Sequence, residues 1–420
     1  MDKLVIEGGK KLRGSVEVSG SKNAALPILA ATLLSEETSV ISNVPALRDV
    51  HTLIKILRSM GVKVLVEDDR VIIHPGKYEG YTAPYKLVST MRASICVLGP
   101  LLAAKGRAQV SLPGGCVIGP RPIDLHLKGL RELGAKIKIE HGYVLADGKK
   151  LRGGRIYLGG PFGSSVLATD NILMTAALTP GKTIIENAAC EPEVSDLIDF
   201  LTKMGAKIKG QSTHTLEVEG VKKLHGAEHR IIDDRIEAGT YLLAAAITKG
   251  AVTVKGARIP HLGALIDKLR EAGVQIKHLP NAIQVKSTGS LRPVDITTLP
   301  FPGFPTDLQA QMMSLMCICP GISVITEKIY PDRFMHISEL NRMGAQIMKE
   351  GPSAIIKGVR QLSGAPVMAS DLRASAALVL AALVAKGRTD ISRVYHLDRG
   401  YERIEEKLTR LGARIWREKE

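Results

Sequence analysis

The sequence has 420 residues, of which 45% are hydrophobic and 24% charged, so it has the composition of a globular chain and not of a disordered one. This length suggests about two or three domains. An excess of 57 Lys and Arg over 42 Asp and Glu gives a net charge of +15, but the basic residues never run beyond adjacent pairs, and aromatic residues are only 4%. These features argue against a polybasic tail or an aromatic surface for nucleic-acid bases, and favour a soluble enzyme with small polyanionic ligands.

The N-terminus and the cysteines favour a cytoplasmic protein. Residues 1–7 contain only three consecutive apolar residues, too few for the core of a signal peptide. The longest apolar stretch, residues 374–385, is shorter than the roughly 18 residues that a membrane span needs. The cysteines are odd in number and follow no spacing pattern, as expected of free thiols in a reducing compartment: Cys96, Cys116, Cys190, Cys317 and Cys319.

An internal repeat is the strongest signal along the chain. The string Leu-x-x-(Met/Leu/Ala)-Gly-(Ala/Val)-x-(Ile/Val) occurs six times at intervals of 68 to 73 residues. A glycine after an amphipathic run ends a helix in the left-handed conformation, and the alternation that follows predicts a strand. The six glycines are Gly61, Gly134, Gly205, Gly273, Gly344 and Gly412.

A second helix and strand recur in phase with this string. Apolar Ala/Leu-rich runs precede β-branched strands, for example at residues 24–34, 235–248 and 371–385. These helices are apolar nearly all round and should be interior. Each repeat therefore reads as about 70 residues of β-α-β-α-β, in an α/β fold. Six such repeats are too many for one core, which predicts a domain of residues 22–232 and a second domain of residues 1–21 plus 233–420.

One segment cannot form a regular element. Residues 113–122 contain three glycines and three prolines, which predicts a loop long enough to act as a lid. Cys116 lies in it with Arg121 five residues on, and a nearby cation can lower a thiol pKa for proton transfer. The alternative, an incidental cysteine in a surface loop, stays open on local sequence alone. Cys96, Cys317 and Cys319 lie in apolar runs and should be core thiols.

Polar residues interrupt the starts of apolar helices at corresponding phases of the repeat. Thr306, Asp307 and Asp371 suit helix caps. A basic residue there opposes the helix dipole, so Lys22, Arg92 and Arg373 favour a bound phosphate or carboxylate over a merely solvated surface. Arg399 is a weaker candidate on local grounds.

Signatures of other ligands are incomplete. Residues 180–183 resemble the end of a P-loop, but its first glycine is replaced by Ala176. His225 and His229 have the spacing of a metal pair, but Gly226 between them favours a loop. We expect no metal and no cofactor.

Taken together, these segments resemble the bacterial UDP-N-acetylglucosamine 1-carboxyvinyltransferases, the MurA enolpyruvyl transferases of the EPSP synthase superfamily. The resemblance covers essentially the whole chain. It implies an inside-out α/β barrel of two domains, each with three βαβαββ-type repeats, a catalytic lid at about 112–122 and an active site in the interdomain cleft. It rests on residues 21–27, 91–94, 112–116 with 121–122, 304–311 and 371–375.

The resemblance also implies a reaction and roles for residues. The enolpyruvyl group of phosphoenolpyruvate passes to the 3-hydroxyl of UDP-N-acetylglucosamine with release of phosphate, the first committed step of peptidoglycan synthesis and so of cell-wall biogenesis, cell shape, cell division and the cell cycle. Cys116 would donate a proton and be the target of fosfomycin, Asp307 would be the base, and Asp371 and Arg373 would assist. A pyruvate adduct of the enzyme is also implied. Phosphoenolpyruvate would contact Lys22, Arg121 and Arg399, and the UDP-sugar would contact Asn23, Arg92, Arg121, Pro122, Ile123, Asp124, Leu125, Gly163, Ser164, Ser165, Val166, Asp307, Ile329 and Arg373.

One residue departs from the family pattern. Leu167 stands where the family usually has glycine, and leucine adopts a positive φ only at a cost, which weakens the assignment of residues 163–166.

Three other functions are alternatives. The nearest is that of 3-phosphoshikimate 1-carboxyvinyltransferase, with the same repeats and the same phosphoenolpyruvate chemistry. The net charge motivates a basic nucleic-acid-binding or RNA-end-processing protein, and a third alternative is a paralogue that binds UDP-sugar without turnover. The main interpretation expects no nucleic-acid or membrane partner and allows a homo-oligomer.

Overall fold

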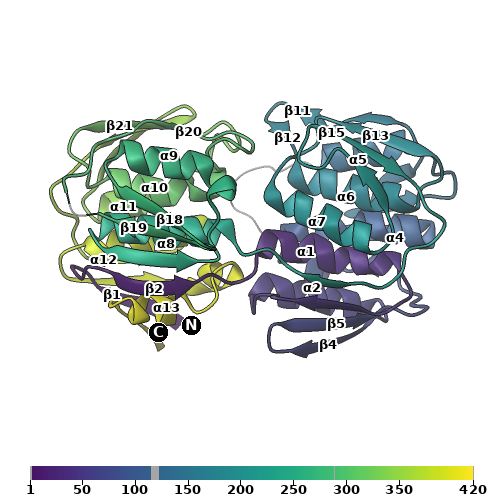
Figure 1. Ribbon diagram of the computed structural model, residues 1–420, viewed down its shortest axis with the longest axis horizontal. Coiled ribbons are helices and arrows are strands. Elements are labelled where there is room, and N and C mark those ends of the chain that lie inside the picture. The colour runs from purple at the N-terminus through teal and green to yellow at the C-terminus, as the bar shows by residue number, and fades with distance from the viewer. Residues whose placement is uncertain (1, 115–122, 288, 420) are drawn as a thin grey trace. The chain divides into compact units, whose positions relative to one another are not determined.

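The computed structural model describes residues 2–114, 123–287 and 289–419. The chain divides into two compact units (Figure 1). The terminal unit holds the N-terminal residues up to Ser19 together with those from Asp233 onward. The central unit holds the described residues from Gly20 to Ile232. Each unit has its own hydrophobic core.

Three four-stranded sheets form the outside of the terminal unit. Strands β1 and β2 come from the start of the chain but pair with strands that follow residue 250. In spatial order, the sheets are β24 (Pro366–Met368), β25 (Arg388–Ser392), β1 (Asp2–Glu7) and β26 (Arg414–Lys419); β18 (Gln275–Leu279), β19 (Ala282–Lys286), β17 (Ala251–Lys255) and β2 (Arg13–Glu17); and β20 (Ile296–Thr297), β21 (Ile322–Thr326), β23 (Ser353–Lys357) and β22 (Gln346–Glu350).

The central unit has three sheets of the same design. A two-stranded hairpin of β11 (Gly159–Gly160) and β12 (Gly163–Ser164) is added to them. The four-stranded sheets are β16 (Glu228–Arg230), β3 (Ser39–Ser42), β5 (Arg70–His74) and β4 (Lys63–Glu67); β6 (Thr82–Ala83), β7 (Arg107–Ser111), β9 (Tyr143–Asp147) and β8 (Lys136–Glu140); and β10 (Arg155–Tyr157), β13 (Lys182–Glu186), β15 (Thr215–Glu219) and β14 (Lys207–Lys209).

All six sheets share one pairing pattern. Each has a parallel pair at one edge and two antiparallel pairs, for example β20 with β21 in parallel, then β21 with β23 and β23 with β22 antiparallel. Among the described strands the sheets are separate, and none closes into a barrel. The fold is therefore α/β, with open sheets outside and helices inside.

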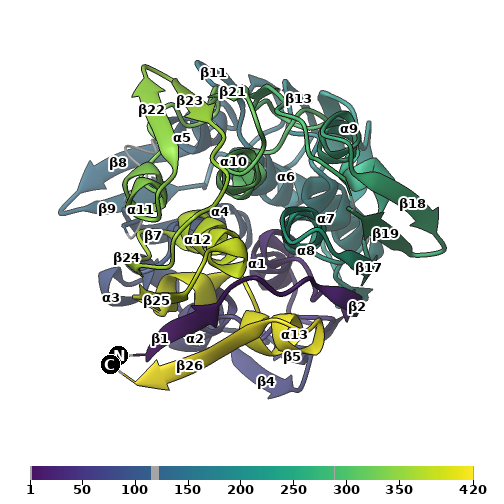
Figure 2. The same ribbon diagram turned by 90° about the vertical axis from the view of Figure 1, so that its left-hand side faces the viewer.

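Apolar helices occupy the interior of each unit, as their composition predicts. Every residue of α8 is buried, and Figure 2 shows α8, α10 and α12 together in the middle of the terminal unit with sheets around them. Gly239 of α8 allows this packing, because an added Cβ would lie 2.5 Å from a Leu308 methyl. The inner helices are α1 (Lys22–Ala31), α4 (Leu98–Lys105) and α6 (Val166–Leu178) in the central unit, and α8 (Arg235–Ile247), α10 (Gln309–Met316) and α12 (Leu372–Val384) in the terminal unit.

Amphipathic helices pack between these inner helices and solvent, and a repeat glycine follows two residues after the end of each. All six glycines have φ between 90° and 100°, which confirms the predicted left-handed stop, and a strand begins two residues after each. The outer helices are α2 (Arg48–Ser59), α5 (Asp124–Glu132), α7 (Pro192–Lys203), α9 (Gly263–Glu271), α11 (Ile337–Arg342) and α13 (Ile404–Arg410). Shorter turns complete the described chain: α3 (Tyr85–Val88) and the 3₁₀-helices η1 (Thr32–Leu34), η2 (Arg92–Val97), η3 (Ile259–His261), η4 (Thr306–Leu308) and η5 (Val394–Arg399).

Within the described ranges, no helix combines the length and the apolar character required to cross a membrane.

Candidate active site

Asp307 is the centre of a buried ion-pair cluster in the terminal unit. It lies inside η4, directly before α10, and the N-cap positions of these two helices are Pro305 and Leu308. Arg333 Nη1 donates to Oδ1 at 2.8 Å and Arg373 Nη2 donates to Oδ2 at 2.8 Å. The arginine side chains are only 6% and 3% exposed, whereas Asp307 is 26% exposed. The carboxylate is thus held by two buried cations, while part of the Asp307 side chain stays accessible.

The charges in this cluster stabilise one another. Burial on its own lowers the pKa of Arg333, but the negative charges of Asp307 and Asp371 outweigh it and leave the pKa raised. Burial likewise opposes the charge of Arg373, and the Asp307 carboxylate again leaves the pKa of the guanidinium raised. Both arginines therefore remain charged, and the cluster is a fixed array of two cations and a carboxylate.

Asp371 caps α12, as one interpretation of its position predicted. Its Oδ1 accepts hydrogen bonds from the backbone N–H groups of Arg373 at 2.9 Å and Ala374 at 3.2 Å. The cap fixes the first turn of α12, and Arg373 in that turn pairs with Asp307 before α10. The starts of two inner helices are thereby tied together. Asp307 does not occupy the N-cap position that was predicted for it, because Pro305 and Leu308 hold that position in η4 and α10.

Lys22, Asn23 and Arg92 lie in the central unit. Lys22 is the first residue of α1, after the N-cap Ser21, and its Nζ lies 3.7 Å from Asp49 Oδ2 on α2. The lysine side chain is 12% exposed, so a carboxylate of the chain itself supplies an anionic neighbour at this helix start. Asn23 is the next residue of α1, and Arg92 begins η2.

Two segments assigned to the UDP-sugar approach each other in the central unit. Residues 123–125 lead into α5, whereas Gly163 and Ser164 form β12. A Cβ at Gly160, opposite Gly163 in the hairpin, would lie 3.3 Å from a Leu125 methyl, so the hairpin packs closely on Leu125. Ser165 caps α6, because its side chain accepts from the N–H of Ala168 at 3.4 Å, and Val166 opens the helix.

The departure at Leu167 has a structural explanation. Leu167 lies in the first turn of α6 and is helical, and the positive φ in this segment belongs to Gly163 instead. Leucine is a good helix former, so it carries no backbone strain at this position. The objection that a leucine would need a positive φ therefore does not apply.

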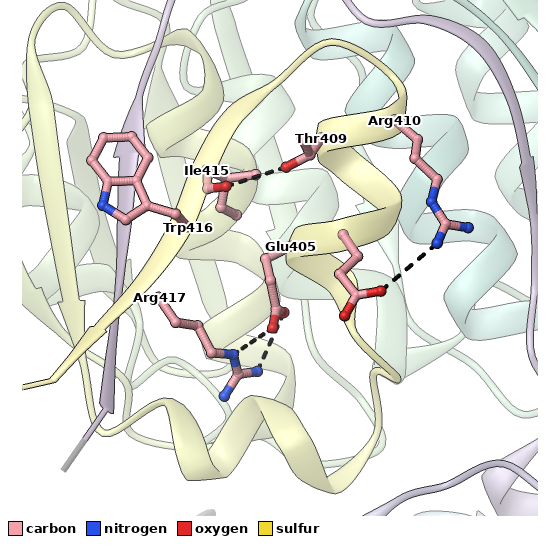
Figure 3. A pocket seen from close by; sticks show the side chains of 7 residues that line it. Glu405, Thr409, Arg410, Ile415, Trp416 and Arg417 are labelled. Carbon is pink, nitrogen blue, oxygen red and sulfur yellow. Dashed lines mark hydrogen bonds and ion pairs between the residues drawn. The ribbon is translucent and has the colours of Figure 1, made fainter.

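A second ion-pair cluster lies next to Arg399, the last residue of η5. Arg417 on β26 donates to both oxygens of Asp398, at 2.5 and 3.1 Å, and to both oxygens of Glu405 on α13, at 2.5 and 3.3 Å. Figure 3 shows the Arg417 guanidinium turned toward Glu405. Planar bidentate contacts of this kind hold both partners in defined positions. The residue immediately before Arg399 is thus anchored to the β1 sheet.

The depression drawn in Figure 3 contains none of the residues assigned to catalysis or binding. It is lined by Glu405, Glu406, Thr409, Arg410, Ile415, Trp416 and Arg417.

His126 is a buried histidine with a defined tautomer, beside Arg92. Asn171 Oδ1 accepts from the N–H of Gly99 at 2.8 Å, so its Nδ2 is the donor to His126 Nδ1 at 2.8 Å. His126 Nδ1 must then be unprotonated. Burial, reinforced by the charge of Arg92, lowers the pKa of His126 to about 3. The folded protein therefore keeps this imidazole neutral.

We expect His126 to make the protein less stable in mild acid. Below the ordinary histidine pKa of about 6.5, the unfolded chain binds a proton that the folded chain does not, so stability present above pH 6.5 is lost as the pH falls toward 3. Between pH 7.5 and 5.5 this costs about 1.4 kcal/mol. His126→Asn keeps an acceptor near Asn171 but cannot titrate, so it should lose about 1.4 kcal/mol less than wild type over this range in urea unfolding.

The matched control is His278→Asn, on an exposed position of β18. It should follow wild type at both pH values. An equal loss of stability in wild type and His126→Asn would contradict the role given to His126.

Comparisons with known proteins agree with one another over the whole chain. The family model of EPSP synthase (3-phosphoshikimate 1-carboxyvinyltransferase) matches residues 6–408. The UDP-N-acetylglucosamine 1-carboxyvinyltransferase of Geotalea uraniireducens is 55% identical over 420 residues, which cover 100% of both chains. UDP-N-acetylglucosamine 1-carboxyvinyltransferase 2 of Carboxydothermus hydrogenoformans is 54% identical over 419 residues, 99% of each chain. The chain therefore belongs to the EPSP synthase family, in the branch of the UDP-N-acetylglucosamine 1-carboxyvinyltransferases.

Solved structures of enolpyruvyl transferases share the fold. The enolpyruvyl transferase NikO from Streptomyces tendae matches with a TM-score of 0.90 at 25% identity, over 99% of this chain and 98% of that one. EPSP synthase from Acinetobacter baumannii matches with a TM-score of 0.78 at 19% identity, over 100% of both chains. The second likeness concerns the fold alone.

The family-implied residues fall in both units. The terminal unit carries Asp307, Ile329, Asp371, Arg373 and Arg399, of which Asp307 and Arg373 are in direct contact. The central unit carries Lys22, Asn23, Arg92, residues 123–125 and residues 163–166. Cys116, Arg121 and Pro122 lie outside the described residues. In the described part of the chain, no group of three or more His, Cys, Asp or Glu side chains is arranged to hold a metal ion.

The predicted core thiols are confirmed. Cys96, Cys317 and Cys319 are fully buried, and burial raises the pKa of Cys96 and brings those of Cys317 and Cys319 to about 12. Cys190 is only half-buried; its Sγ lies 3.4 Å from His214 Nδ1, and its pKa is raised by burial and by Glu191. None of these four thiols is readily ionised near neutral pH.

Sequence reasoning missed two members of the site. Arg333 pairs with Asp307. Glu327 is fully buried and accepts a hydrogen bond from Thr306, the residue before Asp307. Both lie in the segment after β21, which has no periodic pattern. Lys328 follows Glu327 and Asp332 precedes Arg333, so the neighbouring opposite charges in the sequence do not mark either residue as buried. A charged residue in an irregular segment gives no local sign that it is buried. Their roles depend on partners that only the fold brings together.

Proposed function

We propose that this chain transfers the enolpyruvyl group of phosphoenolpyruvate to the 3-hydroxyl of UDP-N-acetylglucosamine and releases inorganic phosphate. The observation that carries this proposal is the 55% identity, over the full length of both chains, to a relative named for that activity. Identity to EPSP synthase is much lower, at 19%, although the fold is shared. The proposal therefore selects the UDP-sugar, and not shikimate 3-phosphate, as acceptor.

Phosphoenolpyruvate would be bound by Lys22, Arg121 and Arg399. Its phosphate and carboxylate carry the negative charges that cations at helix starts and turns recognise. The small exposure of Lys22 supports this role, because a cation held in a largely buried position interacts more strongly with an anion than one in bulk water. The anchoring of Asp398 by Arg417 supports a fixed position for the neighbouring Arg399.

The UDP-sugar would contact residues of both units. From the central unit, the proposal assigns Asn23, Arg92, residues 121–125 and residues 163–166. The close packing of the β11–β12 hairpin on Leu125 supports a joint role for the last two segments. From the terminal unit, the proposal assigns Asp307, Ile329 and Arg373.

In the proposed reaction, Cys116 donates a proton to the methylene carbon of phosphoenolpyruvate. Asp307 accepts the proton of the sugar 3-hydroxyl as its oxygen attacks the adjacent, oxocarbenium-like carbon. The resulting tetrahedral ketal loses phosphate and a methyl proton, which restores the enol double bond. Asp371 assists in positioning or accepts the methyl proton, and Arg373, which remains charged, assists in positioning. The partial exposure of the Asp307 side chain, together with the two arginines that hold its carboxylate, supports its place beside a hydroxyl.

The wider setting follows from the same proposal. The product enters peptidoglycan synthesis, so the enzyme would serve cell-wall biogenesis, cell shape and cell division in the cytoplasm, with fosfomycin as an inhibitor. We also propose that the six sheets correspond to the six sequence repeats, three in each domain. The shared pairing pattern of the sheets supports this correspondence.

The test is phosphate release with two acceptors. Purified protein is incubated with phosphoenolpyruvate and either UDP-N-acetylglucosamine or shikimate 3-phosphate, and inorganic phosphate is measured. We expect phosphate release when UDP-N-acetylglucosamine is the acceptor and none when shikimate 3-phosphate is the acceptor. Release with shikimate 3-phosphate alone would establish the sister activity, and salt-dependent oligonucleotide binding without any phosphate release would favour a nucleic-acid-binding protein.

A further inference from the structure

Glu327 is a buried carboxylate for which the proposed mechanism has no role. It follows β21 directly, is fully buried, and accepts four hydrogen bonds. A carboxylate removed from water is stable only if such donors replace its hydration. The identity of these donors indicates what the residue does.

The two oxygens of Glu327 serve different parts of the site. Oε1 accepts from the Thr298 hydroxyl at 2.5 Å and from the backbone N–H groups of Ile329 at 2.8 Å and Tyr330 at 2.9 Å. Oε2 accepts from the Thr306 hydroxyl at 2.8 Å. One oxygen therefore shapes the turn that carries Ile329, and the other fixes the residue before Asp307.

A continuous chain of hydrogen bonds leads from Glu327 to Asp307. The Thr306 hydroxyl donates to Glu327 and accepts from Arg333 Nη1 at 2.9 Å. The same Nη1 donates to Asp307 Oδ1 at 2.8 Å. Because a hydroxyl has a single proton, its donation to Glu327 leaves a lone pair directed at Arg333. The acceptor oxygen of Glu327 thus sets the direction of the bonds that end at Asp307.

We propose that Glu327 is a positioning residue, which acts through Thr306 and Arg333 to hold the Asp307 carboxylate in place for the sugar hydroxyl. This inference rests on the proposed function, because it assigns Glu327 a part in that reaction. Glu327 itself is not in contact with the reacting atoms. Its effect comes from the orientation of Asp307, and small errors in such orientation are costly for catalysis.

Two substitutions interrupt this chain at different points. Thr306→Val removes the hydroxyl at nearly constant volume. Glu327→Gln can keep an oxygen toward Thr298, Ile329 and Tyr330 but turns an NH₂ group toward Thr306, which must then reverse its hydrogen bond and compete with Arg333. Thr306→Ser keeps the hydroxyl and should restore the chain.

We expect Thr306→Val and Glu327→Gln to lower kcat about ten- to hundredfold, with the KM for UDP-N-acetylglucosamine within about threefold of wild type. Thr306→Ser should remain within a few fold of wild type in both constants. The matched control is Thr326→Val. Thr326 is the last residue of β21, directly before Glu327, and its part-buried hydroxyl pairs at 2.9 Å with Ser353 of β23, without contact with Asp307. This substitution should leave kcat near wild type.

The outcomes are distinct. A kcat for Thr306→Val equal to that of Thr326→Val, or a fall in kcat for Thr306→Ser as large as for Thr306→Val, would overturn the role of Glu327. If Glu327→Gln does not fold, the threonine series alone decides. Failure of the proposed function would appear differently, as wild-type protein that releases no phosphate with either acceptor.

Discussion

Asp307→Ala is expected to reduce turnover by a factor of about one hundred to ten thousand, while the affinity for UDP-N-acetylglucosamine changes little. The physical reason is the loss of the group proposed to accept the proton of the attacking hydroxyl. Steady-state phosphate release gives the turnover, and calorimetric titration with the sugar nucleotide gives the affinity. Turnover close to wild type would remove Asp307 from the mechanism.

The ion-pair geometry predicts a second effect of the same substitution. Arg333 and Arg373 would each lose the carboxylate that pairs with them, and removal of one partner from a buried pair typically costs about 3 to 5 kcal/mol. Asp307→Asn keeps the shape of the side chain and offers one oxygen, so it should lose turnover like Asp307→Ala but less stability. Thermal unfolding of both variants separates catalysis from folding.

A control for charge removal lies on the segment that carries Arg333. Asp332 is exposed and its carboxylate lies 3.5 Å from Lys349 Nζ. Pairs of this kind contribute little to stability. Asp332→Asn should therefore leave turnover and unfolding temperature near wild type. A loss of turnover as large as that of Asp307→Asn would mean that general charge effects, and not the site, explain the result.

The fold was predictable where its signals are local. A glycine that ends a helix and an alternation that begins a strand need no distant partner, and all six repeat glycines have the expected positive φ. The inner helices were recognisable for the same reason, because an apolar surface on every side can be satisfied only in an interior. Asp371 also acts locally, since a cap bonds to N–H groups two and three residues away.

The candidate site residues were named mainly through family resemblance, and the contacts between them could not be predicted from the sequence. The local sequence predicted that Asp307 caps a helix, but the arginines that pair with its carboxylate lie 26 and 66 residues away. Lys22 pointed to an external anion, yet Asp49 of α2 is already near it. Arg333 and Glu327 gave no signal, because irregular segments show no pattern that marks a buried charge. Ion pairs of this kind are set by tertiary packing, which single-sequence patterns do not encode.

The four described thiols are expected to react more slowly with an epoxide than Cys116. An epoxide reacts with a thiolate, and burial raises the pKa of Cys96, Cys317 and Cys319. Cys190 is half-exposed, but its pKa is raised as well. Cys116 lies outside the described residues, but the sequence predicts a Gly/Pro-rich loop around it, with Arg121 five residues on. It is therefore the thiol that we expect to react.

We expect fosfomycin, an epoxide with a phosphonate that can occupy the phosphoenolpyruvate position, to label Cys116 alone and stoichiometrically. UDP-N-acetylglucosamine should accelerate the labelling, because the bound sugar nucleotide is expected to draw the lid over the anion.

Two substitutions of Cys116 test its role in turnover. Cys116→Ala should lose most turnover. Cys116→Asp should keep useful turnover, since a carboxylic acid can also deliver a proton, yet resist the epoxide because a carboxylate is the poorer nucleophile. Peptide mass mapping locates the adduct, and Cys190→Ser, which should label and turn over like wild type, is the matched control. An adduct on Cys190, or normal turnover by Cys116→Ala, would show that the lid thiol is an incidental surface cysteine.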